Sequence, residues 1–341
     1  MNNAGRIILV TPQYAIAGGE MEVVCEGFNV DADGDYGCYI GGEKCRITAA
    51  SSDRLLVTVP ENIEGEIELH LESRGDESEP YAVTIGLLLT EDMHIVANPA
   101  VDPKDDSIIL TRSGSRGQKL PFTLYRLETD GYLDEMSAEI MNPTGIAFDE
   151  DGTLFVTNRS AGEVSRIERG EEVTVFATGL GVATGLAFDR NGVMFVGDRS
   201  GNIYRVTDFG EMELFAVLEP SVSAYHIAFG PDGRLYVAAP GLASHDAIMA
   251  VDEHGNVEKY ARGFGRPQGL AFDVDGNLYS AACFRGKHGV VRIDAETGDT
   301  DMLVSGNNVV GICFTRKGEM IVATNDSVFS LPMGITGTLL N

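Results

Sequence analysis

A short pattern of apolar and turn-forming residues recurs five times between residues 143 and 322. The first copy has an apolar run at 143–148, the turn pair Asp151-Gly152 and a second apolar run at 154–156. The others cover residues 183–196, 225–237, 267–279 and 310–322. An Asp-Gly or Asn-Gly pair supports the tight turn of a β-hairpin because glycine accepts positive φ. Each copy therefore predicts two antiparallel strands joined by a turn.

The copies repeat at a nearly constant distance. Equivalent positions are Gly145, Gly185, His226, Gly269 and Gly311, which gives steps of 40, 41, 43 and 42 residues. Beyond the first hairpin, residues 163–167 and 173–177 alternate as a third and a fourth strand. Four-stranded units that recur at about forty residues are typical of β-propeller blades. A diverged copy at 99–103 and 107–111 brings the predicted number of blades to six.

The last copy ends after its third strand, at residues 327–331. A strand-like segment, residues 91–97, precedes the first blade and aligns with the outer strand 173–177. We expect this N-terminal segment to complete the last blade as its outer strand. Closing the ring in this way would leave no open sheet edge between the two ends of the propeller.

The first 87 residues contain no copy of the repeat. Segments 7–10, 19–25, 54–59, 66–71 and 81–85 predict strands, separated by turn residues at a spacing typical of a β-sandwich. The chain is therefore predicted to be all-β, with one domain over residues 1–87 and a second over residues 88–341.

Two family resemblances follow from these residues. The leading domain resembles an IPT/TIG domain through Thr11-Pro12, Gly18-Gly19-Glu20, Glu26-Gly27-Phe28, Ile40-Gly41-Gly42 and Val57-Thr58-Val59-Pro60. That resemblance implies an immunoglobulin-like sandwich that serves as a spacer or interaction module without catalysis. The repeats resemble NHL-type blades and, more distantly, the six-bladed gluconolactonase-like family. Members of that family often use one end of the central channel as a ligand or active site.

Charge and composition narrow the classes of partner. The net charge of -27 argues against nucleic acid and against an anionic membrane surface, since both would repel the protein. No run of about 18 apolar residues is present to span a membrane. The apolar run 7–10 is too short for a secretion signal, so we expect a cytoplasmic protein. Five cysteines without C-x-x-C spacing predict buried thiols rather than a disulfide or metal site.

Two sets of loops should converge at one end of the channel: those leading into each inner strand and those leaving each second strand. Seven of the 25 lysines and arginines fall in them, namely Arg112, Arg116, Arg159, Arg199, Arg266, Arg285 and Lys287. A local basic mouth would attract a small anion such as a carboxylate or phosphate. The alternative is that these loop charges pair with neighbouring acids. The ligand-binding candidates are Arg112, Asn158, Arg159, Asp198, Arg199, Tyr225, Arg266, Gln268 and Arg285.

His226 is the candidate catalytic residue because it replaces the glycine that most copies carry at this position. An imidazole projecting toward the channel axis can act as a base, a ligand or a hydrogen-bond partner. A core histidine that plugs the channel is an equal alternative.

The gluconolactonase resemblance implies a divalent metal such as calcium, held by Glu, Asn and Asp side chains. The matching positions here are Ala97, Tyr225 and Gln268, so the expected ligands are missing and no metal site or cofactor is predicted. Our leading hypothesis is a non-catalytic binding or scaffold protein whose mouth takes a small anion or a partner peptide. The alternative is a lactonase- or lyase-like enzyme with a rearranged, metal-dependent site around His226, Asn158, Asp198 and Gln268.

Overall fold

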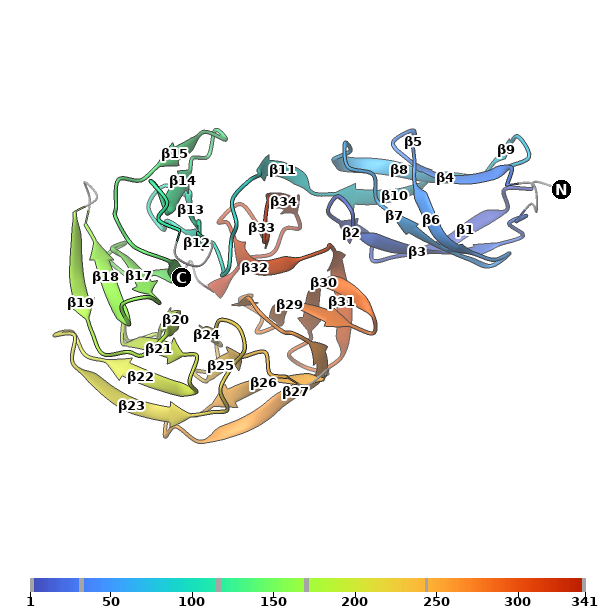
Figure 1. Cartoon of the computed structure of the whole chain (residues 1–341). Helices are drawn as coiled ribbons and strands as arrows, with labels where there is room; N and C mark the ends of the chain where they lie inside the picture. Colours follow the sequence, from blue (N-terminus) through green and yellow to red (C-terminus); the bar gives the residue numbers. More distant parts are fainter. Residues whose placement is uncertain (1–2, 31–33, 115–117, 169–171, 243–244, 339–341) are drawn as a thin grey trace.

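The computed structural model describes residues 3–338 except 31–33, 115–117, 169–171 and 243–244 (Figure 1). The regular structure of the described residues consists of β-strands, as predicted. Within this part of the chain, no helix is long and apolar enough to cross a membrane.

The leading region consists of two sheets around one core. The first has the order β1-β3-β7-β6, formed by Arg6–Thr11, Glu20–Glu26, Arg54–Thr58 and Arg46–Ala50. The second has the order β2-β10-β8-β4-β5 with β9 beside β8, formed by Tyr14–Ala15, Tyr81–Ile85, Gly65–Ser73, Tyr36–Ile40, Glu43–Lys44 and Asp76–Glu77. Side chains such as Val23 and Leu55 of the first sheet pack with Leu69 and Val83 of the second. The five predicted strands are all present, whereas β2, β4, β5, β6 and β9 were not predicted.

The remaining strands form six antiparallel four-stranded units, which we number 1 to 6 along the chain. Unit 1 is β12 to β15, formed by Ala100–Val101, Ile108–Thr111, Leu124–Leu127 and Leu133–Glu135. Unit 2 is β16 to β19, formed by Pro143–Phe148, Leu154–Asn158, Glu163–Ile167 and Val173–Ala177. Unit 3 is β20 to β23, formed by Ala183–Phe188, Met194–Asp198, Asn202–Val206 and Met212–Val217.

Units 4 to 6 continue the same order. Unit 4 is β24 to β27, formed by His226–Phe229, Leu235–Ala238, Asp246–Val251 and Val257–Gly265. Unit 5 is β28 to β31, formed by Leu270–Phe272, Leu278–Phe284, Lys287–Ile293 and Thr300–Ser305. Unit 6 is β32 to β34 with β11, formed by Val309–Phe314, Glu319–Thr324, Val328–Pro332 and Leu87–Thr90. The inner strands contact one another in the order β12, β16, β20, β24, β28, β32 and back to β12, so the units form a ring (Figure 1).

The ring is closed by an N-terminal strand, but not by the predicted residues. β11 pairs antiparallel with β34, with Leu87 opposite Ser330 (Figure 1). Residues 91–97 form no strand, and Asp92 and His94 have positive φ. The buried side chains of Met93 and Ile95 produced the misleading alternation, because they pack in the core between units 6 and 1. The predicted closing segment is therefore corrected to Leu87–Thr90.

The inner strands approach at backbone contact, which explains the recurring glycine. A Cβ on Gly185 would lie 2.8 Å from the carbonyl oxygen of Tyr225 in the next unit. A Cβ on Gly311 would lie 2.4 Å from the carbonyl oxygen of Ala97. No side chain fits at this distance, so the positions require glycine for close approach.

Asn98 connects three units of the ring. Its side-chain amide donates to the carbonyl oxygen of Leu270 in unit 5, at 2.7 Å. Its Oδ1 accepts from the backbone N–H of Ile312 in unit 6, at 3.1 Å. Because Asn98 itself leads into unit 1, one side chain joins the first unit to the last two.

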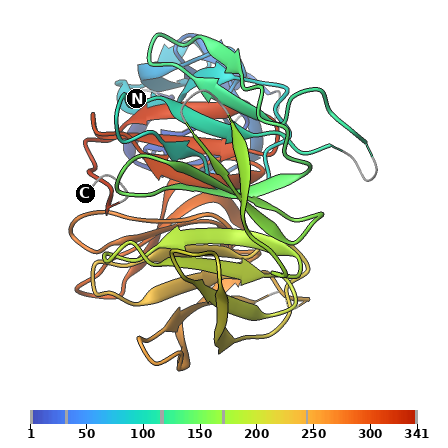
Figure 2. The same ribbon diagram turned by 90° about the vertical axis from the view of Figure 1, so that its left-hand side faces the viewer.

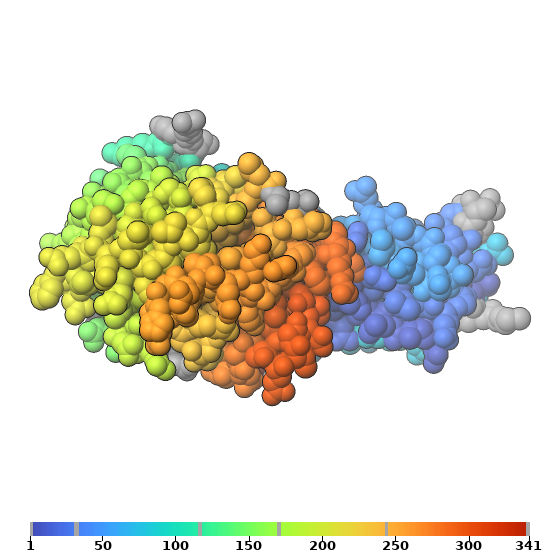
Figure 3. Space-filling view, turned by 90° about the horizontal axis from the view of Figure 1, so that it is seen from below, coloured from blue at the N-terminus to red at the C-terminus, as the bar shows by residue number. Residues whose placement is uncertain are grey.

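The leading region attaches to the ring through β2. This strand pairs parallel to β31, the outer strand of unit 5, and also to β10, so one sheet runs from the ring into the leading region. Ile16, which is 1% exposed, packs into the core shared by units 5 and 6. Lys287 of unit 5 pairs with Glu22 at 3.0 Å. Figure 3 shows the leading region against units 5 and 6, and in Figure 2, from the side of units 2 and 3, it lies behind the ring.

We predict that Gly311→Ala lowers the free energy of unfolding by about 1–3 kcal/mol, because the added methyl group overpacks the contact with Ala97 and Asn98. Gly311 is not among the residues with positive φ, so the cost arises from this contact alone. Urea unfolding measures the change. Thr174→Ala on the exposed outer strand β19 is the control and should shift stability by less than about 0.5 kcal/mol. Equal midpoints for Gly311→Ala and the wild type would contradict the close approach.

Candidate functional site

Two sets of loops meet at one end of the ring, which we call the mouth. Incoming loops lead into the inner strands, and outgoing loops leave the second strands. The Ser113 hydroxyl of unit 1 donates to the carbonyl oxygen of Pro143 in unit 2, at 3.3 Å. The Arg199 guanidinium of unit 3 donates to the carbonyl oxygen of Val222 before unit 4, at 3.0 Å. Outgoing loops thus bond to the incoming loop of the next unit, as the predicted convergence requires.

The opposite end, which we call the turn end, holds the hairpins between inner and second strands. Carboxylates there are bonded to the turns themselves: Asp273 accepts from the backbone N–H groups of Asp275 and Asn277 at 3.0 and 2.8 Å. These bonds explain why Asp recurs at the turns.

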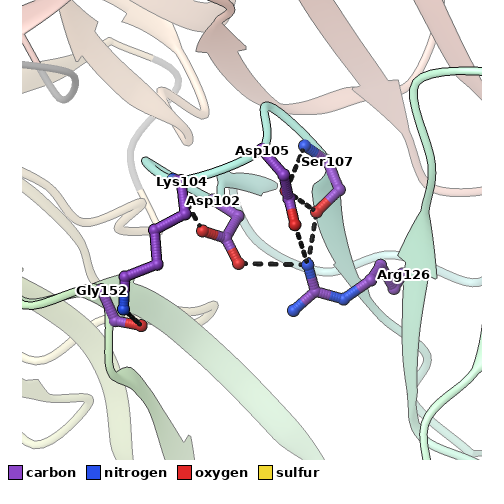
Figure 4. A network of polar contacts seen from close by, with 6 residues as sticks. All are labelled: Asp102, Lys104, Asp105, Ser107, Arg126 and Gly152. Carbon is purple, nitrogen blue, oxygen red and sulfur yellow. Dashed lines mark hydrogen bonds and ion pairs between the residues drawn. The ribbon is translucent and has the colours of Figure 1, made fainter. Parts of the chain in front are cut away.

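Arginines near the turn end are paired with these acids. In unit 1, Arg126 bridges Asp102 and Asp105 at 3.1 and 3.4 Å, and it also donates to Ser107 (Figure 4). Lys104 beside them donates to the carbonyl oxygen of Gly152 in unit 2, at 3.3 Å (Figure 4). Arg234, Arg292 and Arg316 likewise form ion pairs with carboxylates.

Arginines at the mouth differ in this respect. Within the described part of the chain, no ion pair with a carboxylate is formed by Arg112, Arg159, Arg199, Arg266 or Arg285. Lys287 is the exception among the mouth cations, since it pairs with Glu22. Arg116 lies outside the described residues. Pairing with neighbouring acids therefore does not account for these five arginines.

Arg159 and Arg199 come from consecutive units and influence each other. Burial and, next, the charge of Arg199 lower the pKa of Arg159. The Arg199 Nε atom is buried and has no hydrogen-bond partner in the described part of the chain, although another nitrogen of the same guanidinium donates to the carbonyl oxygen of Val222. Two partly buried guanidiniums thus stand near each other with unused donors, an arrangement that favours an anion.

The residues preceding these two arginines position them. Asn158 Oδ1 accepts from the N–H groups of Ser160 and Ala161, at 3.1 and 3.3 Å. Asp198 Oδ1 accepts from the N–H groups of Val182 and Ser200, at 2.8 and 3.1 Å. The candidate side chains of Asn158 and Asp198 are thus engaged in shaping the loops that carry Arg159 and Arg199.

Tyr225 does not present its side chain at the mouth, which corrects the expectation that it contacts a ligand. The residue is 0% exposed, packs in the core between units 3 and 4, and donates its hydroxyl to the carbonyl oxygen of Glu219. Burial and then the charges of Asp198 and Glu219 raise its pKa to about 12. The Tyr225 side chain is buried because it packs against Gly197 of unit 3, where the absence of a side chain leaves space for it.

The remaining candidates lie around the mouth without converging on Arg159. Arg112 donates to the Tyr125 hydroxyl at 3.3 Å. Arg266 is exposed with φ of 48°, and the Arg285 guanidinium lies 4.9 Å from the Phe284 ring centroid. Gln268 is partly buried, and its backbone N–H donates to the carbonyl oxygen of Ala281 at 2.8 Å.

His226 is 4% exposed, and its Nε2 has no hydrogen-bond partner among the residues that the structure describes. Burial lowers its pKa to about 4, so the ring is neutral at physiological pH. The equivalent Gly185 leaves no room for a Cβ beside Tyr225, whereas the same position in unit 4 carries a buried imidazole. The histidine is thus a neutral group packed inside the ring.

The residues at the metal positions implied by the gluconolactonase resemblance do not fit a divalent cation. Ala97 carries only a methyl group, the Tyr225 hydroxyl donates to the carbonyl oxygen of Glu219, and Gln268 is a neutral amide. Hard cations such as calcium require several oxygen donors with carboxylates among them. Over the residues that the structure describes, no group of three or more His, Cys, Asp or Glu side chains is arranged to hold a metal.

A pocket of about 530 Å³ lies at the mouth between units 1 and 2. Its walls include the apolar side chains of Leu120, Pro121, Ile140 and Met141. Asn142 also lines it and donates to the Ser160 hydroxyl at 2.8 Å, next to Arg159. The sequence analysis did not predict this pocket wall or the bonding role of Asn98. For the arginine loops a signal was available in the sequence, namely the matching Asn-Arg-Ser and Asp-Arg-Ser of units 2 and 3.

The chain resembles known proteins in fold but not closely in sequence. No family model matches the chain, and no curated protein matches it. Among solved structures, an auxiliary nutrient binding protein from Bacteroides ovatus has 14% identity and a TM-score of 0.56, covering 97% of this chain and 98% of that chain. A catalytically inactive virginiamycin B lyase from Staphylococcus aureus, with quinupristin, has 14% identity and a TM-score of 0.55, covering 91% and 98%.

A gluconolactonase from Xanthomonas campestris has 15% identity and a TM-score of 0.51, covering 74% of this chain and 87% of that chain. Likeness at such identities concerns the fold alone. The chain is an all-β protein with a β-propeller fold similar to those of gluconolactonase and virginiamycin B lyase.

Proposed function

We propose that the chain is a two-domain binding protein whose mouth takes a small anion. An immunoglobulin-like sandwich of IPT/TIG type, over residues 1–87, precedes a six-bladed propeller of NHL or gluconolactonase-like type over residues 88–341. The observation that carries the proposal is the pair Arg159 and Arg199, partly buried, mutually repulsive and without a carboxylate partner among the described residues.

The domain assignment is supported by the arrangement of the sheets. Two sheets over one core suit a sandwich, and six units whose inner strands form a ring suit a six-bladed propeller. The docked strand β2 suits a module that holds the propeller in one orientation.

Solved structures of both classes share the fold: the auxiliary nutrient binding protein aligns over 97% of this chain, the virginiamycin B lyase over 91% and the gluconolactonase over 74%. The choice of a binding function therefore rests on the arginine pair and on the burial of His226. A free carboxylate and the terminal carboxylate of a partner peptide have the same chemistry for the arginine pair. Charge-assisted bonds from guanidinium to carboxylate are stronger than neutral hydrogen bonds.

We predict that Arg159→Gln and Arg199→Gln each reduce ligand-induced stabilisation by about half or more at the same ligand concentration. The wild type should show a rise in Tm of about 2–4 °C with at least one of acetate, octanoate, gluconate and phosphate at about 100 times Kd. Each variant should weaken binding at least about tenfold because the ligand loses one charged donor. Thermal shift and isothermal titration calorimetry measure both effects.

Arg205→Gln is the matched control, since Arg205 is exposed on β22 away from the mouth. It should retain the full ligand response. If no anion in the set raises Tm, or if the control loses the response equally, the anion site is not at Arg159 and Arg199.

The alternative function is a lactonase- or lyase-like enzyme with His226 as its base. The likeness to a gluconolactonase and a lyase keeps it in consideration. Burial and the lowered pKa of His226 argue against it, because a proton acceptor must reach the substrate.

We predict that His226 makes folding sensitive to acid. Its folded pKa of about 4 lies below the unfolded value of about 6.5, so its contribution is fully present above pH 6.5. The contribution is lost as pH falls from 6.5 to 4, by about 3 kcal/mol in total. His226→Gln removes this dependence, so the difference in unfolding free energy between wild type and variant should shift in the variant's favour by about 2–3 kcal/mol from pH 7 to pH 4.5.

Urea unfolding at the two pH values provides the measurement. His254→Gln is the control, because the His254 side chain is 75% exposed. A constant difference between wild type and His226→Gln at both pH values would show that His226 ionises normally and is open to solvent.

A further inference from the structure

Three exposed apolar side chains lie on the loops that bond to the arginine loops. Met141, Val182 and Val222 are 52%, 41% and 45% exposed. Each stands on an incoming loop, before β16, β20 and β24 respectively. We call these three residues the apolar rim. The three residues thus share one end of the ring, on three consecutive incoming loops.

Backbone and side-chain bonds join the rim to the arginines. Arg199 N–H donates to the carbonyl oxygen of Val182 at 3.2 Å, and its guanidinium donates to that of Val222 at 3.0 Å. Met141 precedes Asn142, whose amide bonds Ser160 beside Arg159. The apolar rim therefore borders the cationic donors on the loops of units 2, 3 and 4, and Met141 continues into the apolar wall of the pocket.

The charge of the site suits one negative charge. The Asp198 carboxylate directly precedes Arg199 and bonds within its loop, and together with the two guanidiniums it gives a sum of one positive charge. The chain as a whole carries -27, and the repulsion of an incoming anion grows with the anion's charge. A monoanion is therefore favoured over a phosphate dianion or a nucleotide.

We infer that the mouth binds a monocarboxylate with an apolar body, such as a medium-chain acyl carboxylate, and discriminates against polyhydroxy acids. The carboxylate is held by Arg159 and Arg199, and the apolar body covers Met141, Val182 and Val222. This inference rests on the proposed function and specifies its ligand class. A sugar acid would place hydroxyl groups against the apolar rim, where hydrogen-bond partners are lost.

The test is a titration of the full chain by isothermal calorimetry, at fixed ionic strength, with butyrate, hexanoate, octanoate, gluconate and inorganic phosphate. Affinity should rise about 2- to 4-fold for each added methylene along the acyl series, since each leaves water for an apolar contact. Octanoate should bind more than about tenfold tighter than gluconate or phosphate.

Two variants separate the two halves of the site. Val222→Ser should lower the affinity for octanoate at least about 3-fold and leave the affinity for gluconate unchanged. Arg159→Gln should lower both affinities. Leu214→Ser is the matched control, because Leu214 is 55% exposed but lies on the outer strand β23. It should change neither affinity.

The outcomes distinguish this inference from the proposed function. If gluconate or phosphate binds as tightly as octanoate and this binding depends on Arg159, the proposed anion site is supported. The inference that the ligand is a monocarboxylate with an apolar body is then overturned. If octanoate binds and Leu214→Ser weakens it as much as Val222→Ser does, the apolar class is also overturned. If no anion binds in an Arg159-dependent way, both the inference and the proposed function fail.

Discussion

The close approach of neighbouring inner strands at the centre of the ring is the constraint on which the rest of the structure depends. At Gly145, Gly185, Gly269 and Gly311 a single methyl group would overlap the backbone of the adjacent unit. This backbone contact between neighbouring inner strands sets the spacing of the units and hence the position of the loops at the mouth. Asn98 supports the same contact where the chain closes, through its bonds to Leu270 and Ile312.

His226 occupies the inner-strand position that carries glycine in the other four clear copies of the repeat. The copy in unit 4 therefore holds an imidazole inside the ring, neutral because it is buried and without a partner for Nε2 among the described residues. The group most suggestive of catalysis in the sequence is thus withdrawn from the mouth. The chemistry at the mouth comes instead from two arginines on consecutive loops, each held by an Asn or Asp that folds the loop around it.

The arginines at the two ends of the ring differ in their ion pairs, although both ends are built from the same repeat. At the turn end, Asp residues cap hairpins and pair with Arg126, Arg234 and Arg316. At the mouth, Asp198 Oδ1 accepts from two backbone N–H groups and Oδ2 accepts from the Ser200 hydroxyl, whereas Nε of the neighbouring Arg199 has no hydrogen-bond partner among the described residues. The arginines of the turn end are therefore paired with carboxylates, whereas Arg159 and Arg199 at the mouth have no carboxylate partner among the described residues.

The repeat determined the strand pairs of units 2 to 6 and their order, because alternation and Asp-Gly turns are local properties of the chain. It also indicated that an N-terminal strand completes unit 6. The identity of that strand was decided by packing: Met93 and Ile95 alternate like a strand but fill the core between units 6 and 1, so Leu87–Thr90 forms the pair. For the same reason, Tyr225 and His226 proved to be buried, and Arg159 and Arg199 proved to be neighbours. Which side chains reach the mouth depends on the distance between units, and that distance is set by contacts between residues about forty positions apart.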